Sequence, residues 1–335
     1  MSRRRRESGV ALLVVLLTIA LLTIVVMEFT YSTQVETHFA LAVRNGLQAH
    51  YLARSGVNIG ELLLLRDPSK GTDSEQDLWA QRFPPLPAGD GTIALRIRDE
   101  GSVLNLNGIL SGDSVRPERV AIFTRLFDLL GIDQQVLAAI VDWIDSDNEP
   151  RTTPMGAEQP YYLGMTPPVT VRNGPLVTLR ELLSVRGVTP AILERLEGFV
   201  AVHRRQDNLV VNVNTAPAEV LYALSEGLSA DPGIVDRLIA TRREQPFLTQ
   251  GDWRSIPGFD EALGESRAFV KLGSMYFRIE AMGTVNQTTR GIVARVRRDG
   301  GRLQRVTWTP SLVPLALTSQ SPSDFLKTLS PPGSG

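Results

Sequence analysis

The feature that constrains this chain most is an apolar run that follows a basic N-terminus. Arginines occupy positions 3–6, and the run covers residues 10–27 with Thr18 and Thr23 as its only polar members. At about 1.5 Å per residue, a helix of this length is just able to cross a hydrocarbon core of roughly 30 Å. The sequence therefore predicts that residues 10–27 form a transmembrane helix.

The residues on either side of the run indicate how it is processed and oriented. A secretory signal has a shorter apolar region and ends in a small-residue cleavage site, whereas here Glu28 follows directly. The small residue suited to processing is Gly9, before the run. Because positively charged flanks stay in the cytoplasm, the remainder of the chain is expected on the far side of the membrane. An uncleaved signal anchor is the alternative interpretation.

A basic leader that ends in glycine and precedes a retained apolar helix resembles the precursors of type IV pilins. The resemblance implies that a prepilin peptidase removes residues 1–9 by cleaving between Gly9 and Val10, and that Val10 is then N-methylated. Most pilins carry glutamate at the fifth mature position, where this chain has Val14. Within the pilin class, the K minor pseudopilins of the type II secretion system characteristically lack this carboxylate.

The helical pattern continues beyond the membrane run. Residues 31–66 contain no proline, and apolar residues recur at intervals of three and four. We expect one continuous or once-bent helix over residues 10–66, ended by the Asp67-Pro68 pair. Each interior glycine weakens a helix by about 1 kcal/mol relative to alanine. A bend or a close packing contact is therefore expected at Gly46, Gly56 and Gly60.

Alternating apolar and polar residues predict strands near both ends of the remaining chain. The expected strands are 92–99 with 101–107 as its partner, and later 276–285, 289–298 and 303–308. Between these groups nearly every segment has a helical pattern. The predicted fold class is α+β, in which a long helix and a small antiparallel sheet form a pilin-like head from residues 67–106 and 273–310. An all-helical domain, residues 107–272, is inserted between the strands.

Three local motifs lie in the predicted insertion. They are D-W-I-D-S-D from Asp142 with G-A-E-Q-P-Y-Y from Gly156, L-V-T-L-R-E-L-L-S-V-R-G-V-T from Leu176, and V-N-V-N-T-A-P from Val211. In this order they closely resemble the K minor pseudopilin family. The resemblance implies a single-pass protein of the bacterial inner membrane with a periplasmic C-terminal region. It also implies a position at the tip of the periplasmic pseudopilus, a role in starting its assembly for export of folded proteins, and the I and J pseudopilins as partners.

Carboxylates gather after the first of these motifs. Asp145, Asp147 and Glu149 alternate along a loop, Pro150 prevents helix there, and Glu158 is able to fold back toward them. Converging carboxylates repel one another unless a hard cation intervenes, and several oxygen ligands suit Ca²⁺ better than Zn²⁺. The spacing does not fit the twelve-residue EF-hand loop.

The family resemblance implies a calcium-stabilised helical domain. Its ligands are carried onto Asp145, Asp147 and Glu158, and also onto Asp142. The alternative is an acidic loop in solvent, with Asp145 capping a turn.

A DNA-binding interpretation rests on segments that resemble helix-hairpin-helix modules, such as 242–247 and 256–259. Such hairpins hold phosphate through backbone N–H groups at the start of a helix. Here Glu226 and Asp231 stand where a phosphate would approach, and the chain has 35 Lys and Arg against 36 Asp and Glu. Both features argue against DNA as a partner. A membrane-anchored periplasmic DNA-binding protein remains the alternative function.

Catalytic and redox chemistry find little support in the sequence. His38, His50 and His203 are far apart in the chain, and no serine lies in a hydrolase motif. The chain has no cysteine, so no disulfide braces it. We therefore expect a structural protein and not an enzyme. Residues 311–335 are rich in Pro, Ser and Gly and are expected to form a disordered tail.

Overall fold

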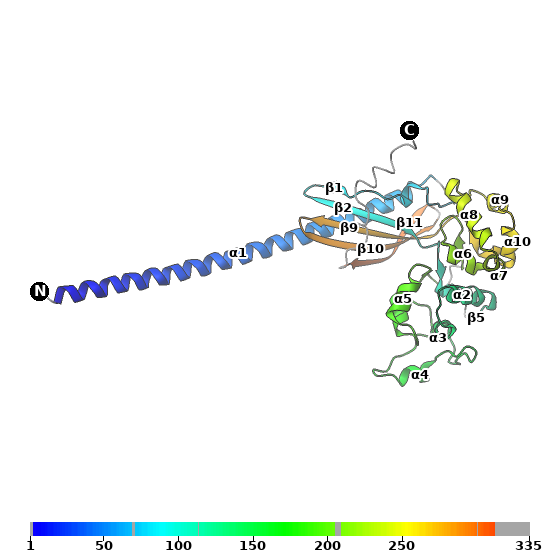
Figure 1. Ribbon diagram of the computed structural model, residues 1–335, viewed down its shortest axis with the longest axis horizontal. Helices are drawn as coiled ribbons and strands as arrows, with labels where there is room; N and C mark the ends of the chain where they lie inside the picture. Colours follow the sequence, from blue (N-terminus) through cyan, green and yellow to red (C-terminus); the bar gives the residue numbers. More distant parts are fainter. Residues whose placement is uncertain (1–2, 69–70, 113, 205–208, 300, 312–335) are drawn as a thin grey trace, which may run out of the picture.

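The computed structural model describes residues 3–68, 71–112, 114–204, 209–299 and 301–311. It consists of one very long helix that carries two folded units at its C-terminal end (Figure 1). The first unit, called the head, is a five-stranded sheet packed on the end of the long helix. The second unit, called the inserted domain, is formed by the chain between the second and third strands of that sheet.

Helix α1 extends from Arg3 to Leu65 without interruption, which confirms the predicted long helix. Its apolar run has a mean hydropathy of 3.2 over the best window, and none of that window is buried against the described protein. The hydroxyls of Thr18 and Thr23 donate to the carbonyls of Val14 and Ile19 one turn earlier. Both polar side chains are thus satisfied within the helix, as a lipid environment requires.

The head is an antiparallel sheet with the strand order β1-β2-β9-β10-β11. Its strands are β1 (Leu86–Ala88), β2 (Gly91–Asp99), β9 (Tyr276–Val285), β10 (Thr288–Asp299) and β11 (Arg302–Ser311). A short 3-10 helix, η1 (Leu78–Ala80), lies between α1 and β1. The predicted strands 92–99, 276–285, 289–298 and 303–308 are confirmed.

The C-terminal half of α1 covers one face of this sheet because small residues let the two elements approach closely. A Cβ on Gly56 would lie 2.9 Å from the Cβ of Ala281, and one on Gly60 would lie 2.8 Å from Ile279 Cγ2. On the sheet, a Cβ on Gly283 would lie 2.1 Å from the Ala49 carbonyl oxygen. The glycines predicted to mark close packing therefore do so at Gly56 and Gly60.

The inserted domain contains nine short α-helices and three short 3-10 helices among the residues that the structure describes. The α-helices are α2 (Pro117–Leu129), α3 (Gln134–Ile144), α4 (Gln159–Leu163), α5 (Pro190–Leu196), α6 (Ala218–Leu224), α7 (Glu226–Ala230), α8 (Pro232–Glu244), α9 (Gln250–Arg254) and α10 (Phe259–Leu263). The 3-10 helices are η2 (Leu106–Ile109), η3 (Leu179–Ser184) and η4 (Gly264–Phe269).

The inserted domain is not purely helical, which corrects the all-helical prediction. It also holds three ladders of two-residue strands that pair β3 with β6, β4 with β5 and β7 with β8. These strands are β3 (Leu104–Asn105), β4 (Leu110–Ser111), β5 (Ser114–Val115), β6 (Val200–Ala201), β7 (Val211–Asn212) and β8 (Val270–Lys271). The strands are too short for a sequence pattern of period two to reveal them.

The predicted pairing of 92–99 with 101–107 is wrong, because β2 pairs with β1 and β9. Leu104 and Leu106 are fully buried in the core of the inserted domain, while the side chains of Asn105 and Asn107 form hydrogen bonds with backbone groups. The alternating pattern therefore reflects entry into a second core. Leu104, Asn105 and Leu106, which the sequence assigned to the head, therefore belong to the inserted domain.

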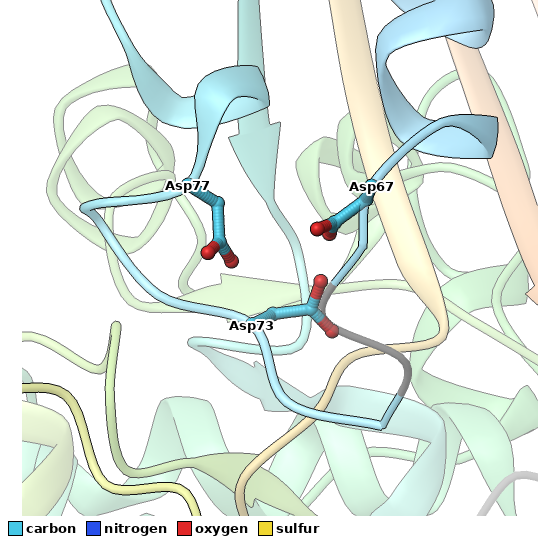
Figure 2. A group of neighbouring side chains, drawn as sticks. All are labelled: Asp67, Asp73 and Asp77. Carbon is cyan, nitrogen blue, oxygen red and sulfur yellow. The ribbon is translucent and has the colours of Figure 1, made fainter.

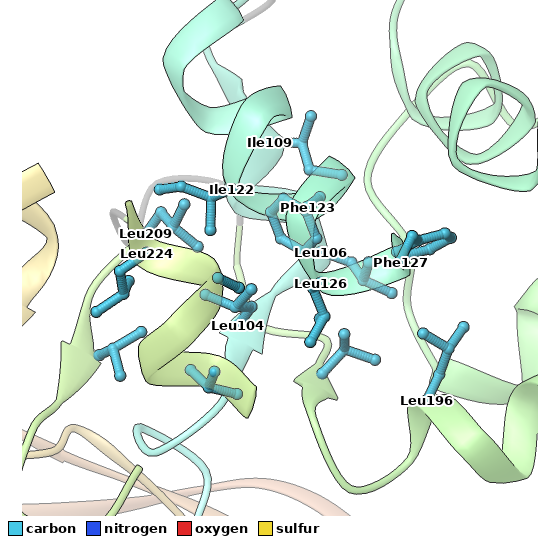
Figure 3. Close-up of a cluster of buried hydrophobic side chains, with 14 of the residues drawn as sticks. Leu104, Leu106, Ile109, Ile122, Phe123, Leu126, Phe127, Leu196, Leu209 and Leu224 are labelled. Atoms are coloured by element: carbon cyan, nitrogen blue, oxygen red, sulfur yellow. The ribbon is translucent and has the colours of Figure 1, made fainter. Parts of the chain in front are cut away.

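Two separate hydrophobic cores hold the molecule together. The core of the head joins α1 to the sheet, and the larger core fills the inserted domain. Figure 3 shows side chains from several elements converging there, among them Phe123 and Phe127 of α2 and Leu224 of α6. At the other end of the chain, β11 includes Ser311, so the predicted tail of residues 311–335 begins one residue too early. Residues 312–335 lie outside the described residues.

Candidate functional site

Three carboxylates predicted to bind a cation come together at one edge of the inserted domain. Asp145 ends α3, Glu158 precedes α4, and Asp147 lies in the loop between them. One carboxylate oxygen from each lies within 4.8 Å of the others. Asp145 and Glu158 are buried whereas Asp147 is exposed, so the group is open to solvent on one side.

Glu158 is the member of the group whose charge is least compensated. Its side chain is 2% exposed, yet neither carboxylate oxygen has a hydrogen-bond partner of normal geometry in the described part of the chain. Burial, together with the negative charges of Asp145, Asp142 and Asp147, raises the pKa of Glu158 to about 7. A buried carboxylate without donors is costly, and a bound cation would remove that cost.

Asp142 lies beside the three carboxylates but does not belong to the group. It is fully buried on α3, its Oδ2 accepts a hydrogen bond from the backbone N–H of Arg151, and burial raises its pKa to about 6. A Cβ on Gly156 would lie 1.9 Å from this Oδ2, so only glycine lets the loop pass there. Asp142 thus closes the base of the loop.

A second set of contacts holds the loop from the side. The side-chain amide of Asn173 donates to the carbonyl of Asp147 at 2.7 Å and to Asn148 Oδ1 at 3.0 Å. Asp147 Oδ1 also accepts the backbone N–H of Glu149 at 2.8 Å. Glu149 itself is exposed and lies outside the group of three. The loop is therefore preformed for oxygen ligands that point inward.

The first two sequence motifs pack against each other beneath this loop. Trp143 Nε1 donates to Glu181 Oε1 at 3.1 Å, and the Trp143 ring meets that of Tyr162 edge to face. Tyr162 is buried, which raises its pKa to about 12, and its hydroxyl accepts the backbone N–H of Arg186. The Arg186 guanidinium donates to the carbonyl of Gly156 at 2.9 Å. The motif residues thus build the support of the carboxylate group.

The third motif joins the inserted domain to the head. The side-chain amide of Asn212 lies within hydrogen-bonding distance of the Asp73 carbonyl, Asp99 Oδ2 and Ser274 Oγ. Nearby, the buried guanidinium of Arg242 donates to the carbonyls of Val213 and Ala216, and its burial lowers its pKa to about 10. This motif therefore has a structural role at the junction.

Another carboxylate group, which sequence reasoning missed, lies where α1 ends. Asp67, Asp73 and Asp77 come from one loop and approach one another closely (Figure 2). The Arg298 guanidinium of β10 pairs with both Asp73 and Asp67. Because Arg298 already pairs with two of the three carboxylates, the group is an ion-paired contact between the loop and the sheet. The spacing of the three aspartates could have indicated that they lie close together. Their pairing with Arg298 could not be predicted, because Arg298 is distant in sequence.

The remaining predicted residues do not join either group. Val10 and Val14 lie on the exposed surface of α1, and Gly9 belongs to the same helix, at the end remote from both units (Figure 1). His203 stacks on Tyr276 with ring centroids 4.0 Å apart, whereas His38 and His50 lie on α1. The three histidines therefore form no common site.

The segment expected to approach DNA uses its own side chain to cap a helix. Asp231 Oδ1 accepts the backbone N–H of Gly233 at 3.0 Å, at the start of α8. Glu226 is exposed on the neighbouring α7. A phosphate at this helix start would have to displace one carboxylate and approach another.

Comparisons with known proteins agree on one family. The family described as "Type II secretion system (T2SS), protein K" matches residues 102–205 and 211–270 in two parts. The type II secretion system protein K of Aeromonas hydrophila is 30% identical over 329 residues, covering 89% of this chain and 98% of that protein. The protein K of Pseudomonas aeruginosa is 28% identical over 308 residues, covering 88% and 90%.

A solved structure has the same fold. It is the crystal structure of the GspK–GspI–GspJ complex from the type 2 secretion system of enterotoxigenic Escherichia coli, with a TM-score of 0.63 and 19% identity. The match covers 84% of this chain and 100% of the matched chain. With the relatives above, it leads to a plain conclusion: this chain belongs to the protein K family of the type II secretion system.

Proposed function

We propose that this minor pseudopilin caps the tip of a periplasmic pseudopilus, helps initiate its assembly, and so supports export of folded proteins across the outer membrane. The observation that carries the proposal is the division of the molecule into an exposed apolar helix and a bulky end. Side chains of α1 are exposed from Val10 to Arg44, whereas both folded units lie beyond that stretch.

The bulk of the inserted domain favours the apex. Pilin-like subunits stack with their N-terminal helices in the fibre core and their heads outside. The inserted domain projects from the end of the head that is remote from the membrane helix (Figure 1). A subunit stacked above would collide with it, while at the apex nothing lies above.

Position 14 supports the same placement. In the pilin class, the glutamate at mature position five is thought to meet the N-terminal amine of the preceding subunit. Val14 offers no carboxylate, so this chain has nothing with which to neutralise the amine of a subunit above it. A subunit that lacks this contact is suited to be first in the fibre.

The partners that we propose are the I and J minor pseudopilins of the same secretion system. The similar solved structure is a complex of GspK with GspI and GspJ. The exposed apolar residues of α1 beyond the membrane run, such as Val35, Phe39 and Val43, supply a surface for neighbouring pilin helices. These contacts would be made through α1 and the head.

Processing and location follow from the same proposal. The precursor is cleaved between Gly9 and Val10 by a prepilin peptidase, and Val10 is methylated. The mature protein stays in the bacterial inner membrane through residues 10–27 until assembly, with its C-terminal region in the periplasm. Its role is structural, without a catalytic step.

We further propose that Ca²⁺ binds Asp145, Asp147 and Glu158, with Asp142 supporting the loop from behind. The unpartnered oxygens of buried Glu158 and the convergence of three carboxylates support this assignment. The donors are all oxygens, which suits a hard cation. The ion would fix the loop between α3 and α4 and so stabilise the inserted domain.

Co-purification tests the tip proposal. The full chain is co-expressed with the I and J subunits of the same organism, extracted in detergent and analysed by native mass spectrometry. We expect a complex with one copy of each subunit. Recovery of this chain only as a homopolymer, or without either partner, would contradict the proposal.

A further inference from the structure

The face of the head sheet opposite α1 carries a row of arginines. Arg98 of β2 is the direct cross-strand partner of Arg278 on β9, and Arg278 is the partner of Arg295 on β10. Like charges directly opposite on neighbouring strands destabilise a sheet. A row of three therefore calls for compensation or for a function.

Carboxylates compensate this row only in part. Glu280, 2% exposed, accepts hydrogen bonds from Arg96, the shorter at 2.6 Å, and forms ion pairs with Arg278 at 2.9 Å and with Arg98 at 3.7 Å. Glu100 pairs with Arg295 at 2.9 Å. Burial lowers the pKa of Arg98, while Glu280 and, more weakly, Glu197 of the inserted domain raise it. The four arginines of this face thus share three carboxylates, namely those of Glu100, Glu197 and Glu280.

The row leads into a cavity of about 600 Å³ at the junction of the head and the inserted domain. In β11, Thr307 is the partner of Arg295, and a β-bulge follows, so Val306 and Thr307 both line the cavity. The lining residues that matter here are Arg172, Arg204 and Arg295, with an apolar wall that includes Pro175, Leu176 and Val177. Among the described residues, this lining includes three arginines and no carboxylate.

The arginines of the cavity have unequal partners. Arg172 pairs with Glu181, and Arg295 pairs with Glu100. Arg204 is exposed and forms no ion pair with any residue that the structure describes. Over the described part of the cavity and the adjoining row, six arginines face four carboxylates, namely Glu100, Glu181, Glu197 and Glu280. The surface therefore keeps a positive excess on a protein whose overall charge is close to zero.

We propose that this cavity and the arginine row bind an acidic, extended segment of a partner protein. The guanidinium groups would take its Asp or Glu carboxylates, as arginine clusters do in acidic-motif recognition. The apolar wall, formed by residues such as Pro175, Leu176 and Val177, would take the side chains between them. Nucleic acid fits less well, because its affinity needs a wide basic excess and aromatic stacking surfaces, and Tyr276 is already stacked on His203.

Fluorescence anisotropy with the full chain in detergent tests the proposal. The probe is a labelled decapeptide of alternating glutamate and valine, and the control probe replaces glutamate by glutamine. The variant Arg204→Glu reverses the arginine without an ion pair. The matched control Arg82→Glu reverses another exposed arginine, which does not belong to the lining and forms no ion pair with a residue that the structure describes. The basic leader is common to all samples.

We expect the acidic peptide to bind, Arg204→Glu to weaken it about tenfold, and Arg82→Glu to leave it unchanged. The glutamine peptide should bind the wild type no more tightly than the acidic peptide binds Arg204→Glu. Equal binding of both peptides, or equal loss in both variants, would overturn the proposal. A labelled single-stranded oligonucleotide that bound more tightly than the acidic peptide, and lost affinity in Arg204→Glu, would overturn the choice of a protein partner.

Discussion

At the scale of single residues, Glu158 decides how the inserted domain responds to pH. Its pKa in the calcium-free protein is about 7, above the ordinary value of 4.5, because it is buried among other carboxylates. The folded state therefore holds the proton more tightly than the unfolded state. The favourable contribution of protonated Glu158 to the free energy of unfolding is fully present below about pH 4.5. It is lost as the pH rises toward 7.

The first prediction concerns this pH dependence. Without calcium, the free energy of unfolding of the wild type, relative to that of Glu158→Gln, should fall between pH 4.5 and pH 7 and stay level above it. Chemical unfolding of both proteins in chelator at a series of pH values measures the difference. A difference that rises with pH over this interval would show that donors stabilise the Glu158 carboxylate.

The second prediction uses the same substitution to test metal binding. At pH 8, Glu158→Gln should stabilise the calcium-free protein, since it removes a buried uncompensated charge. In saturating calcium, the variant should melt below the wild type because it lacks a ligand. Melting curves of both proteins with and without calcium give the four values. Equal responses to calcium in the two proteins would remove Glu158 from the ligand set.

The third prediction concerns the contact of α1 with the sheet. In Gly283→Ala, the added methyl group would meet the backbone of Ala49 and Ala53, which cannot rotate away. We expect a loss of about 1–3 kcal/mol in the free energy of unfolding. The control is Gly198→Ala, where a Cβ meets nothing within 4 Å. If the two variants unfold alike, α1 does not pack as closely as described.

Sequence reasoning found part of the residue-level picture. Asp145, Asp147 and Glu158 were predictable because they lie near one another in the chain and share one chemistry. The neutralisation of Asp73 by Arg298 was not, since the two residues are brought together only by the fold of the sheet. The same holds for Arg242, because no local sequence pattern predicts its hydrogen bonds to the third motif.

At the scale of elements, α1 and the long strands were predictable because each shows its own period over many residues. The hydrophobic run and the absence of proline specify α1, and alternation specifies β2, β9 and β10. The segment 101–107 is the exception, because its alternating pattern does not correspond to a strand paired with β2. Its leucines alternate as in a strand, yet they enter a second core, a fact that depends on distant residues such as Leu209.

The fourth prediction belongs to α1. Val14→Glu places at mature position five the carboxylate that interior pilins use, so the variant should also enter interior positions of the fibre. Secretion should then fall to a small fraction of the wild-type level, whereas the conservative Val14→Leu should keep it. Secreted substrate in the culture medium is the readout, with equal membrane levels of both variants as the condition. Full secretion by Val14→Glu would remove the argument from this position.

At the scale of the whole molecule, two cores and a hydrogen-bonded junction join three parts in one chain: an exposed apolar helix, a head and a bulky inserted domain. The inserted domain has many short helices and loops, so a bound ion would contribute much to its order.

The fifth prediction concerns the effect of calcium on the stability of the full chain. Calcium at one hundred times its dissociation constant should stabilise the full chain by about 2.7 kcal/mol. Calorimetry with calcium and with chelator should show a higher melting temperature in calcium, and identical curves would contradict the site.

The central claim, that the chain is processed and assembled as a pseudopilin, is tested most directly at its N-terminus. Intact-mass and fragment mass spectrometry of the membrane-extracted protein, from cells with and without the prepilin peptidase, identifies the first residue. We predict an N-methylated chain that begins at Val10 when the peptidase is present and an unprocessed chain when it is absent. A chain that retains residues 1–9 in both cells would contradict the account.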